Sequence, residues 1–413
     1  MRRLAACKAP LGLLVPTRRL WRALAPAPLR RAAGLVTGRV VFESMVHTLA
    51  RRRGLQGAGL PALVGLFSGA SGVALSVQLA SRALDQLGID HRRIDVGDIA
   101  APNDPGERSA DAWIFYLNPP ELMSLLFRWD GLEFAGPRFG HWAWELPEAP
   151  ASWVRAVKAM DAVMAQSQYT ADAFAGKPVT VTPHPLFADD LCRVAPKPRR
   201  APGDNFTVVN LFDFKSAFAR KNPLGALAAF QTAFAGDLST RLIIKTQNAD
   251  KAPELARALV AHSDRNVEII DEIWPYARVL NLIASADALI SLHRAEGFGL
   301  TLAEAMALGT PVVATGWSGN LDFMDAETAC LAPVMLVPVA DPQGIYRGGR
   351  WAEPNADVAA EHLRRLRDDP AFAAGLAMRA RNRVLRQLNP NAWFETLPPM
   401  LRAVLSESRR RAG

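Results

Sequence analysis

A short apolar segment, a glycine-rich turn and a helix constrain the fold of this chain more than any other feature. Residues 288–292 supply the apolar run that is typical of a buried strand. Gly297 and Gly299 allow positive φ angles and a close approach of the backbone to a ligand. Helix-forming residues follow over 300–308, and the Gly-Thr-Pro sequence at 309–311 ends them. The pattern predicts an α/β unit whose turn lies at the carboxyl end of a strand.

Such a turn presents free backbone N–H groups and the positive end of a helix dipole, which together favour a phosphate or a diphosphate. Glu296 and Glu304 bracket the turn, with seven residues between them. Carboxylates repel a bare phosphate but bind diols well, and a nucleotide sugar has both a diphosphate and diols. The alternative interpretation is an ordinary α/β turn with two solvated glutamates.

The basic charge of the chain is concentrated at its start. The chain has 413 residues, enough for two domains of ordinary size, and a net charge of +8. Residues 1–55 contain twelve lysines and arginines but only one acidic residue, Glu43. The remainder is close to neutral or slightly acidic, so a nucleic-acid-binding surface is not indicated.

Three interpretations of the basic leader stay open: a flexible segment, a surface anchor on anionic lipid, and a linker from an upstream module. Its apolar runs are too short to span a bilayer. Cys7, Cys192 and Cys330 are odd in number and far apart, so they predict neither a disulfide framework nor a metal cluster. We therefore expect a cytoplasmic protein, with peripheral contact to the inner face of a membrane as one option.

The first folded unit is expected to begin near Gly59. A strand at 63–67, a glycine turn at 68–72 and a helix at 73–87 form a Rossmann-like start. The full glycine fingerprint of a dinucleotide site is absent, so a nicotinamide-dependent oxidoreductase is only a weak alternative. Strands are also predicted at 91–96 and 112–117.

An aromatic segment at 138–147 holds two tryptophans, a histidine and a glutamate within five residues. Aromatic faces pack on sugar rings, and histidine or glutamate can bind hydroxyl groups. We predict that His141, Trp142 and Glu145 contact a sugar substrate, with simple packing as the alternative. His184 lies between two prolines and is interpreted as a linker residue rather than a catalyst.

The second half alternates strands, at 206–212, 241–245, 266–270 and 310–315, with helices. This alternation predicts a parallel sheet whose ligands bind at the carboxyl ends of the strands.

The string at 287–301, with its Glu-x7-Glu pattern, resembles the family-four retaining glycosyltransferases, and residues 142–147 resemble a bacterial, polysaccharide-type branch of that family. The resemblance implies an α/β fold of the GT-B type, with two Rossmann-like domains whose parallel sheets face each other across a cleft. It divides the chain into a leader (1–58), an acceptor domain (59–185), a nucleotide-sugar domain (186–390), and a final helix and tail that cross back (391–413).

The resemblance also assigns roles to residues. Glu296 is placed near the donor sugar, Glu304 at the ribose diol, and Lys221 at the donor diphosphate, with His141 as a further catalytic candidate. The other predicted donor-binding residues are Gly72, Lys215, Arg220, Gly297, Phe298, Gly299, Leu300 and Thr301, and the predicted acceptor-binding residues are Trp142 and Glu145.

The implied function is metal-independent, retaining transfer of a hexose, with mannose as one candidate, from a nucleotide sugar to a glycan or lipid-linked acceptor in surface polysaccharide synthesis. No Asp-x-Asp metal motif occurs in the chain, so no metal or other cofactor is expected. The resemblance suggests that the leaving phosphate itself deprotonates the acceptor. A non-catalytic module that binds nucleotide sugars on the same scaffold is the alternative.

Overall fold

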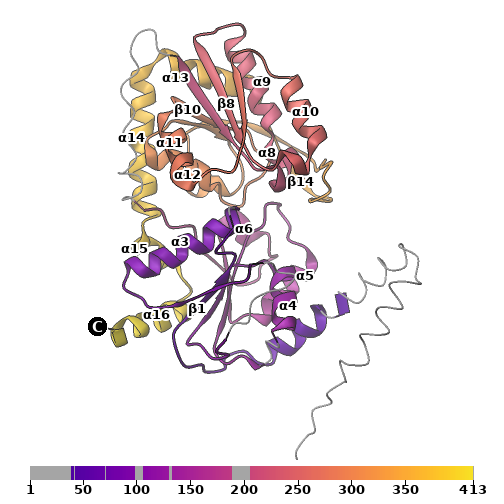
Figure 1. The fold of residues 1–413 in the computed structure, drawn as a ribbon, viewed down its shortest axis with the longest axis vertical. Helices are drawn as coiled ribbons and strands as arrows, with labels where there is room; N and C mark the ends of the chain where they lie inside the picture. The colour runs from indigo at the N-terminus through magenta and orange to yellow at the C-terminus, as the bar shows by residue number, and fades with distance from the viewer. Residues whose placement is uncertain are drawn as a thin grey trace, which may run out of the picture.

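The computed structural model describes residues 39–40, 42–69, 71–97, 106–129, 133–187 and 205–412, and side chains up to residue 408. Over these residues the chain forms two α/β domains that lie one above the other (Figure 1). Each domain contains a six-stranded sheet in which all strand pairs are parallel.

The sheet of the N-terminal domain has the strand order β2-β1-β3-β4-β5-β6. Its strands are β1 (Ala62–Gly65), β2 (Arg92–Asp95), β3 (Trp113–Phe115), β4 (Arg138–Trp142), β5 (Ala162–Ala165) and β6 (Val179–Val181). The helices between them are α3 (Gly72–Gln86), α4 (Pro119–Arg128), α5 (Ala151–Ala156) and α6 (Gln168–Asp172). Because parallel strands end at one edge of the sheet, the loops that follow them meet there.

The segment just before the first sheet packs into the N-terminal core. Residues 42–50 are helical, and Phe42, Met45, Val46 and Leu49 follow the spacing of an amphipathic helix. Leu49 is fully buried. The prediction of a flexible leader over 1–58 is therefore wrong for this helix, because its apolar stripe packs against the sheet. Residues 1–38 lie outside the described part of the chain.

The C-terminal sheet has the order β12-β11-β10-β7-β8-β9. Its strands are β7 (Phe206–Leu211), β8 (Thr240–Thr246), β9 (Val267–Asp271), β10 (Ala288–Ser291), β11 (Val312–Thr315) and β12 (Cys330–Ala332). Its helices are α8 (Phe218–Lys221), α9 (Pro223–Phe234), α10 (Pro253–Ala261), α11 (Tyr276–Ser285), α12 (Leu300–Leu308), α13 (Ala356–Asp368) and α14 (Pro370–Gln387).

Helix α12 begins and ends at glycines in the left-handed region. Gly299 precedes it with φ of 93°, and Gly309 follows it with φ of 78°. Most other residues are strained at such angles, so the two glycines set the length of the helix. The turn at 297–299 consequently delivers the first turn of α12 to the carboxyl edge of β10.

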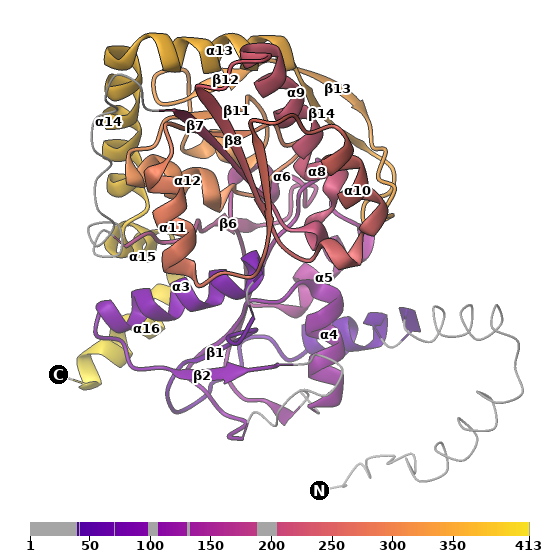
Figure 2. The same ribbon diagram turned by 45° about the horizontal axis from the view of Figure 1, so that its top comes forward.

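The end of the chain returns to the N-terminal domain. Helices α15 (Pro390–Thr396) and α16 (Pro399–Ala412) follow α14 and lie beside α3 (Figures 1 and 2). Their buried side chains Trp393, Leu397 and Leu401 join the apolar cluster on the α3 face of the first sheet. The two places where the chain passes between the domains are joined by a hydrogen bond of 2.6 Å from the Leu186 N–H to the Leu388 carbonyl.

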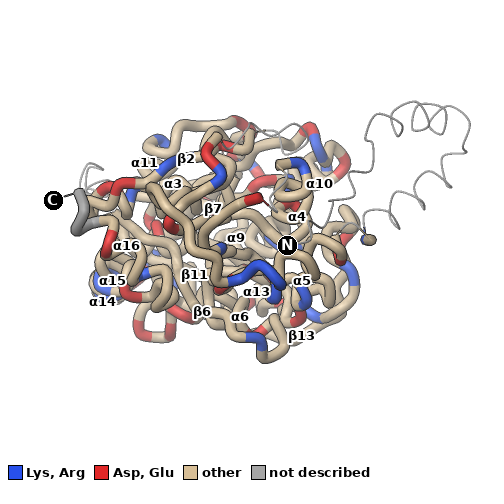
Figure 3. The backbone as a smooth tube through the Cα atoms, turned by 90° about the horizontal axis from the view of Figure 1, so that it is seen from below, with Lys and Arg blue, Asp and Glu red and all other residues tan. Residues whose placement is uncertain are grey.

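A β-hairpin extends the C-terminal domain towards the N-terminal one. It consists of the antiparallel strands β13 (Val334–Pro338) and β14 (Arg350–Pro354). A small apolar cluster combines Tyr346 and Trp351 from this region with Leu146 of the other domain. Acidic and basic positions are interspersed over the face of the molecule seen from below (Figure 3).

Candidate functional site

The carboxyl edges of the two sheets enclose a cleft of about 980 Å³. The N-terminal domain contributes the loops after β1, β3, β4 and β5, and the C-terminal domain contributes those after β7, β8 and β10. All the predicted site residues but one line this cleft: Gly72, His141, Glu145, Lys215, Arg220, Lys221, Glu296, Gly297, Phe298, Gly299, Leu300, Thr301 and Glu304. The exception is Trp142.

Two cations hold the carboxylate of Glu296. The Lys221 Nζ lies 2.6 Å from Oε1, and the Arg220 Nη1 lies 3.3 Å from Oε2. Burial alone would raise the pKa of Glu296, but the two cations outweigh burial and lower its pKa to about 2. Glu296 is therefore ionised at every pH at which the protein would be studied, and Lys221 and Arg220 are held at the glycine turn.

The surrounding backbone fixes the Arg220 side chain. Its Nη1 donates a hydrogen bond of 2.8 Å to the carbonyl of Ala295, and its guanidinium lies 5.8 Å from the ring centroid of Tyr346. The Arg294 N–H donates to the Arg220 carbonyl at 2.7 Å. Because Arg220 is only 4% exposed, the guanidinium cannot turn away into solvent.

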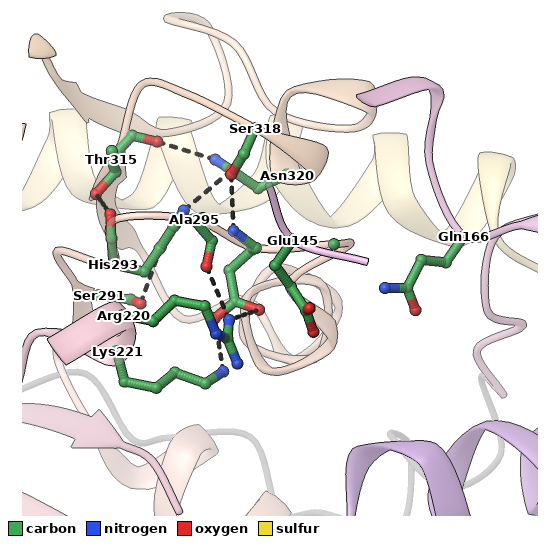
Figure 4. A network of polar contacts seen from close by, with 12 residues as sticks. Glu145, Gln166, Arg220, Lys221, Ser291, His293, Ala295, Thr315, Ser318 and Asn320 are labelled. Atoms are coloured by element: carbon green, nitrogen blue, oxygen red, sulfur yellow. Dashed lines mark hydrogen bonds and ion pairs between the residues drawn. The ribbon is translucent and has the colours of Figure 1, made fainter. Parts of the chain in front are cut away.

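Buried polar side chains support the strand end that carries Glu296. The Ser318 Oγ accepts a hydrogen bond of 2.9 Å from the Glu296 N–H. Asn320 donates from Nδ2 to the Thr315 carbonyl, and its Oδ1 lies 3.1 Å from the His293 Nε2 (Figure 4). These contacts anchor the loop after β11 to the loop after β10, so the position of Glu296 is set by the fold.

Glu304 lies on α12, on the far side of the turn from Glu296. Its Oε1 accepts a hydrogen bond of 2.6 Å from the Tyr276 hydroxyl, and it is 3% exposed. Burial raises the pKa of Glu304 to about 7, against the opposing effect of Tyr276. The two glutamates of the Glu-x7-Glu pattern therefore differ, since one is firmly ionised and the other titrates near neutrality.

The turn at 297–301 combines backbone N–H groups with an interdomain contact. The first two residues of α12, Leu300 and Thr301, line the cleft with the rest of this turn, and their N–H groups precede the first bonds of the helix, which Leu302 and Ala303 donate to the Gly299 carbonyl. The Gly297 carbonyl accepts hydrogen bonds from the Ser167 and Thr170 hydroxyls of the N-terminal domain, at 2.5 and 3.2 Å. A Cβ at Gly297 would lie 2.0 Å from the Gln166 Nε2 and 3.1 Å from the Trp144 carbonyl, so a larger residue there would displace the Gln166 side chain and crowd the opposite domain.

Gly72 starts α3 at the opposite wall. The Ser71 hydroxyl caps this helix by accepting a hydrogen bond from the Ala74 N–H. A Cβ at Gly72 would meet no atom within 4 Å. The described part of the protein therefore leaves room for a side chain at this position.

His141 and His184 form a buried pair in the N-terminal wall. The His141 ring stacks on Tyr116 at 4.6 Å between centroids, and its Nε2 lies 3.0 Å from the Thr182 carbonyl. Burial lowers the pKa of His141 to about 4, and burial together with His141 lowers the pKa of His184 to about 3. Both rings are therefore neutral at pH 7.

His184 is buried and lines the cleft. It contacts the Gln166 Oε1 at 3.1 Å and packs edge-to-face on Phe298 of the other domain. His184 follows the last strand of the N-terminal domain, as a linker residue would, and the prediction did not include its position in the cleft.

The prediction that Trp142 binds the acceptor is wrong. Trp142 is fully buried and packs against Phe174 in the core on the α4 and α5 face of the sheet. Side chains alternate between the two faces of a strand, and His141 takes the other face. Trp144, two residues later, lines the cleft instead.

Glu145 reaches across the cleft to the β13–β14 region. Its Oε2 accepts a hydrogen bond of 2.8 Å from the Tyr346 hydroxyl, and the Tyr346 ring packs near Trp144. Lys215 lines the cleft from an exposed position, so it offers a mobile charge where Arg220 offers a fixed one. Tyr346 and Tyr276 were not predicted, since an isolated tyrosine carries no motif.

Among the described residues, no cluster of three or more histidine, cysteine, aspartate or glutamate side chains is arranged to hold a metal ion. Within the same part of the chain, none of the helices combines the length and apolar character that crossing a bilayer requires. Cys330 is buried, whereas Cys7 and Cys192 lie outside the described residues.

Residues 214–348 match the family described as Glycosyl transferases group 1. This segment contains the Arg220–Lys221 pair and the whole turn from Glu296 to Glu304. No curated protein matches the chain in sequence.

Solved structures share the architecture at low sequence identity. Sucrose-phosphate synthase from Thermosynechococcus elongatus is 16% identical with a TM-score of 0.60, and the match covers 84% of this chain and 100% of that one. Alr3699/HepE of Anabaena, in complex with UDP and glucose, is 14% identical with a TM-score of 0.57 over the same shares.

A point mutant of TarM from S. aureus, in complex with Fondaparinux, alpha-GlcNAc-glycerol and UDP, is 12% identical with a TM-score of 0.52. The match covers 71% of this chain and 55% of that one, so the chain spans about half the length of TarM.

The two parallel sheets, the cleft at their carboxyl edges and these likenesses confirm the predicted fold class. The chain therefore has the GT-B fold of glycosyltransferases, and residues 214–348 of its second domain match the group 1 glycosyl transferases.

Proposed function

We propose that this protein is a retaining, metal-independent glycosyltransferase that moves a hexose from a nucleotide sugar to a glycan or lipid-linked acceptor. The observation that carries the proposal is the grouping of Lys221, Arg220 and the first turn of α12 around Glu296 in one cleft. A diphosphate fits the cations and the helix end, and hydroxylated groups fit the two glutamates.

The chemistry of transfer explains why these groups are needed together. Breaking the bond between the anomeric carbon and the phosphate oxygen builds negative charge on the leaving diphosphate. Lys221, Arg220 and the N–H groups of the 297–301 turn stabilise that charge without a metal ion. Removing one well-placed donor from such a site costs about 3 kcal/mol, which is roughly a hundredfold in rate.

The proposed path keeps the configuration of the anomeric carbon. In it, the leaving phosphate oxygen accepts the proton of the acceptor hydroxyl on the same face of the sugar from which the phosphate departs. The neutral ring of His141 and the ionised Glu296 border this region and orient the donor sugar. Glu304 accepts hydrogen bonds from the ribose diol.

The proposed pathway, donor sugar and location rest on the sequence and on one solved structure. The Trp-Ala-Trp-Glu-Leu-Pro segment at 142–147 favours a bacterial polysaccharide pathway, with mannose as one candidate sugar. The structure of Alr3699/HepE contains UDP and glucose, so UDP-glucose also belongs among the first donors tried. We propose a cytoplasmic location, with the basic residues before position 39 in contact with anionic lipid.

A thermal-shift screen of UDP, GDP, ADP and NAD, followed by donor hydrolysis without acceptor, tests the proposal. We expect one nucleoside diphosphate to raise the melting temperature and the matching nucleotide sugar to be hydrolysed in the presence of EDTA. Glu296→Ala and Lys221→Ala should each lower turnover about a hundredfold. Stabilisation by NAD alone, or turnover that survives both substitutions, would refute the proposal.

The same screen distinguishes the proposed enzyme from a non-catalytic module that only binds nucleotide sugars. That alternative has one structural argument in its favour, since Lys221 and Arg220 are already engaged by Glu296. It predicts stabilisation by a nucleoside diphosphate with no hydrolysis of any nucleotide sugar.

For the leader, deleting residues 1–38 should abolish binding to anionic vesicles but leave donor hydrolysis unchanged.

A further inference from the structure

The two walls of the cleft differ in charge. The C-terminal wall contains the cations Lys215, Arg220, Lys221 and Lys245. Among the described residues of the N-terminal wall, no lysine or arginine lines the cleft, and the two acidic side chains there are Glu121 and Glu145. Arg220 of the opposite wall is close enough to Glu145 to interact with it electrostatically, so Glu121, rather than Glu145, is the carboxylate that a ligand on the N-terminal wall meets without a cation.

Glu121 has an unused hydrogen-bonding position. It follows Pro119 and Pro120 in the first turn of α4, and its carboxylate accepts a hydrogen bond from its own backbone N–H. Its Oε2 is buried and has no hydrogen-bond partner. A buried carboxylate oxygen without a partner costs free energy, so a hydroxyl donor in the cleft would be bound favourably there.

The helix ends on this wall do not supply an anion site for an acceptor. Because Pro119 and Pro120 lack N–H groups, the start of α4 offers no free donors at its first two positions. At α6 the Gln168 N–H already donates to the Asp322 Oδ2 at 2.7 Å. The start of α3, at Gly72, is already among the donor-binding residues predicted from the sequence.

Two aromatic rings line the same wall as Glu121. Trp144 and Trp153 both line the cleft, with ring centroids 5.0 Å apart in an edge-to-face arrangement. Asn118, the residue before α4, uses its Oδ1 to accept a hydrogen bond of 2.9 Å from the Ala143 N–H, which ties the start of α4 to the strand that leads to Trp144. The C–H face of a sugar ring packs well on such indoles.

We propose that the N-terminal wall selects an uncharged sugar as the acceptor, with Glu121 receiving a hydrogen bond from one of its hydroxyl groups and Trp144, supported by the buried Trp153, packing on its ring. This inference rests on the proposed function and specifies the acceptor of that same cleft. A phosphate or uronate group beside Glu121 would meet no cation of the N-terminal wall, and is disfavoured there by repulsion.

A matched pair of acceptors tests the selection. Methyl glucoside and methyl glucuronide share one ring and differ in charge, and each is offered with the donor that the hydrolysis screen identifies. We expect kcat/KM for transfer to the glucoside to be at least about tenfold higher than for the glucuronide. If neither sugar accepts, the glucoside should inhibit donor hydrolysis at a concentration about tenfold lower than the glucuronide. The same comparison is made with methyl mannoside and mannose 6-phosphate.

Equal or better use of the charged sugars overturns the inference, and so does donor hydrolysis that no uncharged glycoside affects. In both cases donor hydrolysis still stands, so the proposed function survives. If no nucleotide sugar is bound or hydrolysed, the proposed function fails and the inference fails with it.

Variants of Glu121 test its role directly. Glu121→Ala should raise the acceptor KM about tenfold, whereas Glu121→Gln, which can still accept from a hydroxyl, should raise it less. Stabilisation by the nucleoside diphosphate, measured for both variants, shows whether each is folded. The exposed Glu133, on the same domain and outside the cleft, supplies the control Glu133→Gln. An unchanged acceptor KM in Glu121→Ala would refute the assignment.

Discussion

The Tyr346 hydroxyl donates a hydrogen bond of 2.8 Å to the Glu145 carboxylate and thereby joins the two domains across the cleft. The Tyr346 ring also lies near Trp144 on one domain and the Arg220 guanidinium on the other. One side chain consequently connects the N-terminal wall of the cleft with the cation that holds Glu296.

Tyr346→Phe should lower kcat/KM about tenfold, because it removes a hydrogen bond to a charged group and keeps the ring. Glu145→Gln should have a smaller effect, and the double variant should lose little more than Tyr346→Phe alone. Donor turnover in the four proteins of this cycle gives the coupling energy. Additive losses would show that the two residues act independently.

Glu304→Gln should stabilise the protein at pH 8 and weaken nucleotide binding. The folded-state pKa of Glu304 is raised from 4.5 to about 7, so its contribution to stability is present in full below pH 4.5 and is lost as the pH rises through 7. Glutamine keeps the contact with Tyr276 without an ionisable group. The gain in unfolding free energy at pH 8 is about 3 kcal/mol as an upper limit.

Urea unfolding of both proteins at pH 5 and pH 8 measures this effect, and the gain should nearly vanish at the lower pH. Binding of the nucleoside diphosphate to the wild type should weaken as the pH falls below 7, because the ribose diol donates to the ionised carboxylate. The Glu304→Gln variant should lack that pH dependence. A gain of equal size at both pH values would contradict the assigned ionisation.

The candidate site shows which kinds of information a sequence carries. Glu296, Gly299 and Glu304 were predictable, because a strand, a left-handed turn and a helix each leave a local pattern. Trp142 was mistaken for Trp144 because a single aromatic segment does not reveal where β4 ends, and the face of each side chain depends on that register. Tyr346 contacts Glu145 over 201 residues of sequence, and no local pattern records such a contact.

Gly297→Ala should impair closure of the cleft without unfolding either domain. The new Cβ would lie 2.0 Å from the Gln166 Nε2 and 3.1 Å from the Trp144 carbonyl, and both belong to the opposite domain. We expect a larger radius of gyration by small-angle scattering and a fall in turnover of about tenfold or more.

Gly72→Ala is the matched control for this experiment. It adds the same methyl group to the same cleft, where no protein atom lies within 4 Å, so the radius of gyration should not change. A loss of donor turnover in Gly72→Ala with unchanged scattering would support close approach by the donor. Identical scattering from both variants would refute the steric role of Gly297.

Removal of residues 1–53 should destabilise the N-terminal domain, whereas removal of residues 1–38 should not. The fully buried Arg138 donates from Nη2 to the Leu49 and Arg52 carbonyls, at 3.0 and 2.9 Å. Its Nε and Nη1 have no partners, so losing these carbonyls leaves a buried cation poorly compensated. The expected cost is about 3–5 kcal/mol.

Thermal unfolding of the two truncated proteins measures this difference. Arg138→Met in the shorter protein should recover part of the lost stability, because methionine fills similar space without a charge. Equal melting temperatures for the two truncations would show that the 42–50 helix contributes little.

The leader illustrates the limit of reasoning from composition. Its many arginines favour an interpretation as a flexible basic segment. The apolar residues Phe42, Met45, Val46 and Leu49 within it nevertheless have the spacing of an amphipathic helix. The pairing of that stripe with the sheet, and of its carbonyls with Arg138, depends on the assembled domain. The spacing of these four residues therefore predicts the helix, whereas the net charge of the segment does not.

The hydrogen bond between Leu186 and Leu388 joins the two segments that connect the domains. Because the two connecting segments of chain are bonded to each other there, and Thr182 adds a second bond to Thr396, both connections lie along one line. We expect any opening of the domains to pivot about these two connections, so that the cleft widens at the edge farthest from them. Donor and acceptor would then exchange at that edge while the two connections stay bonded.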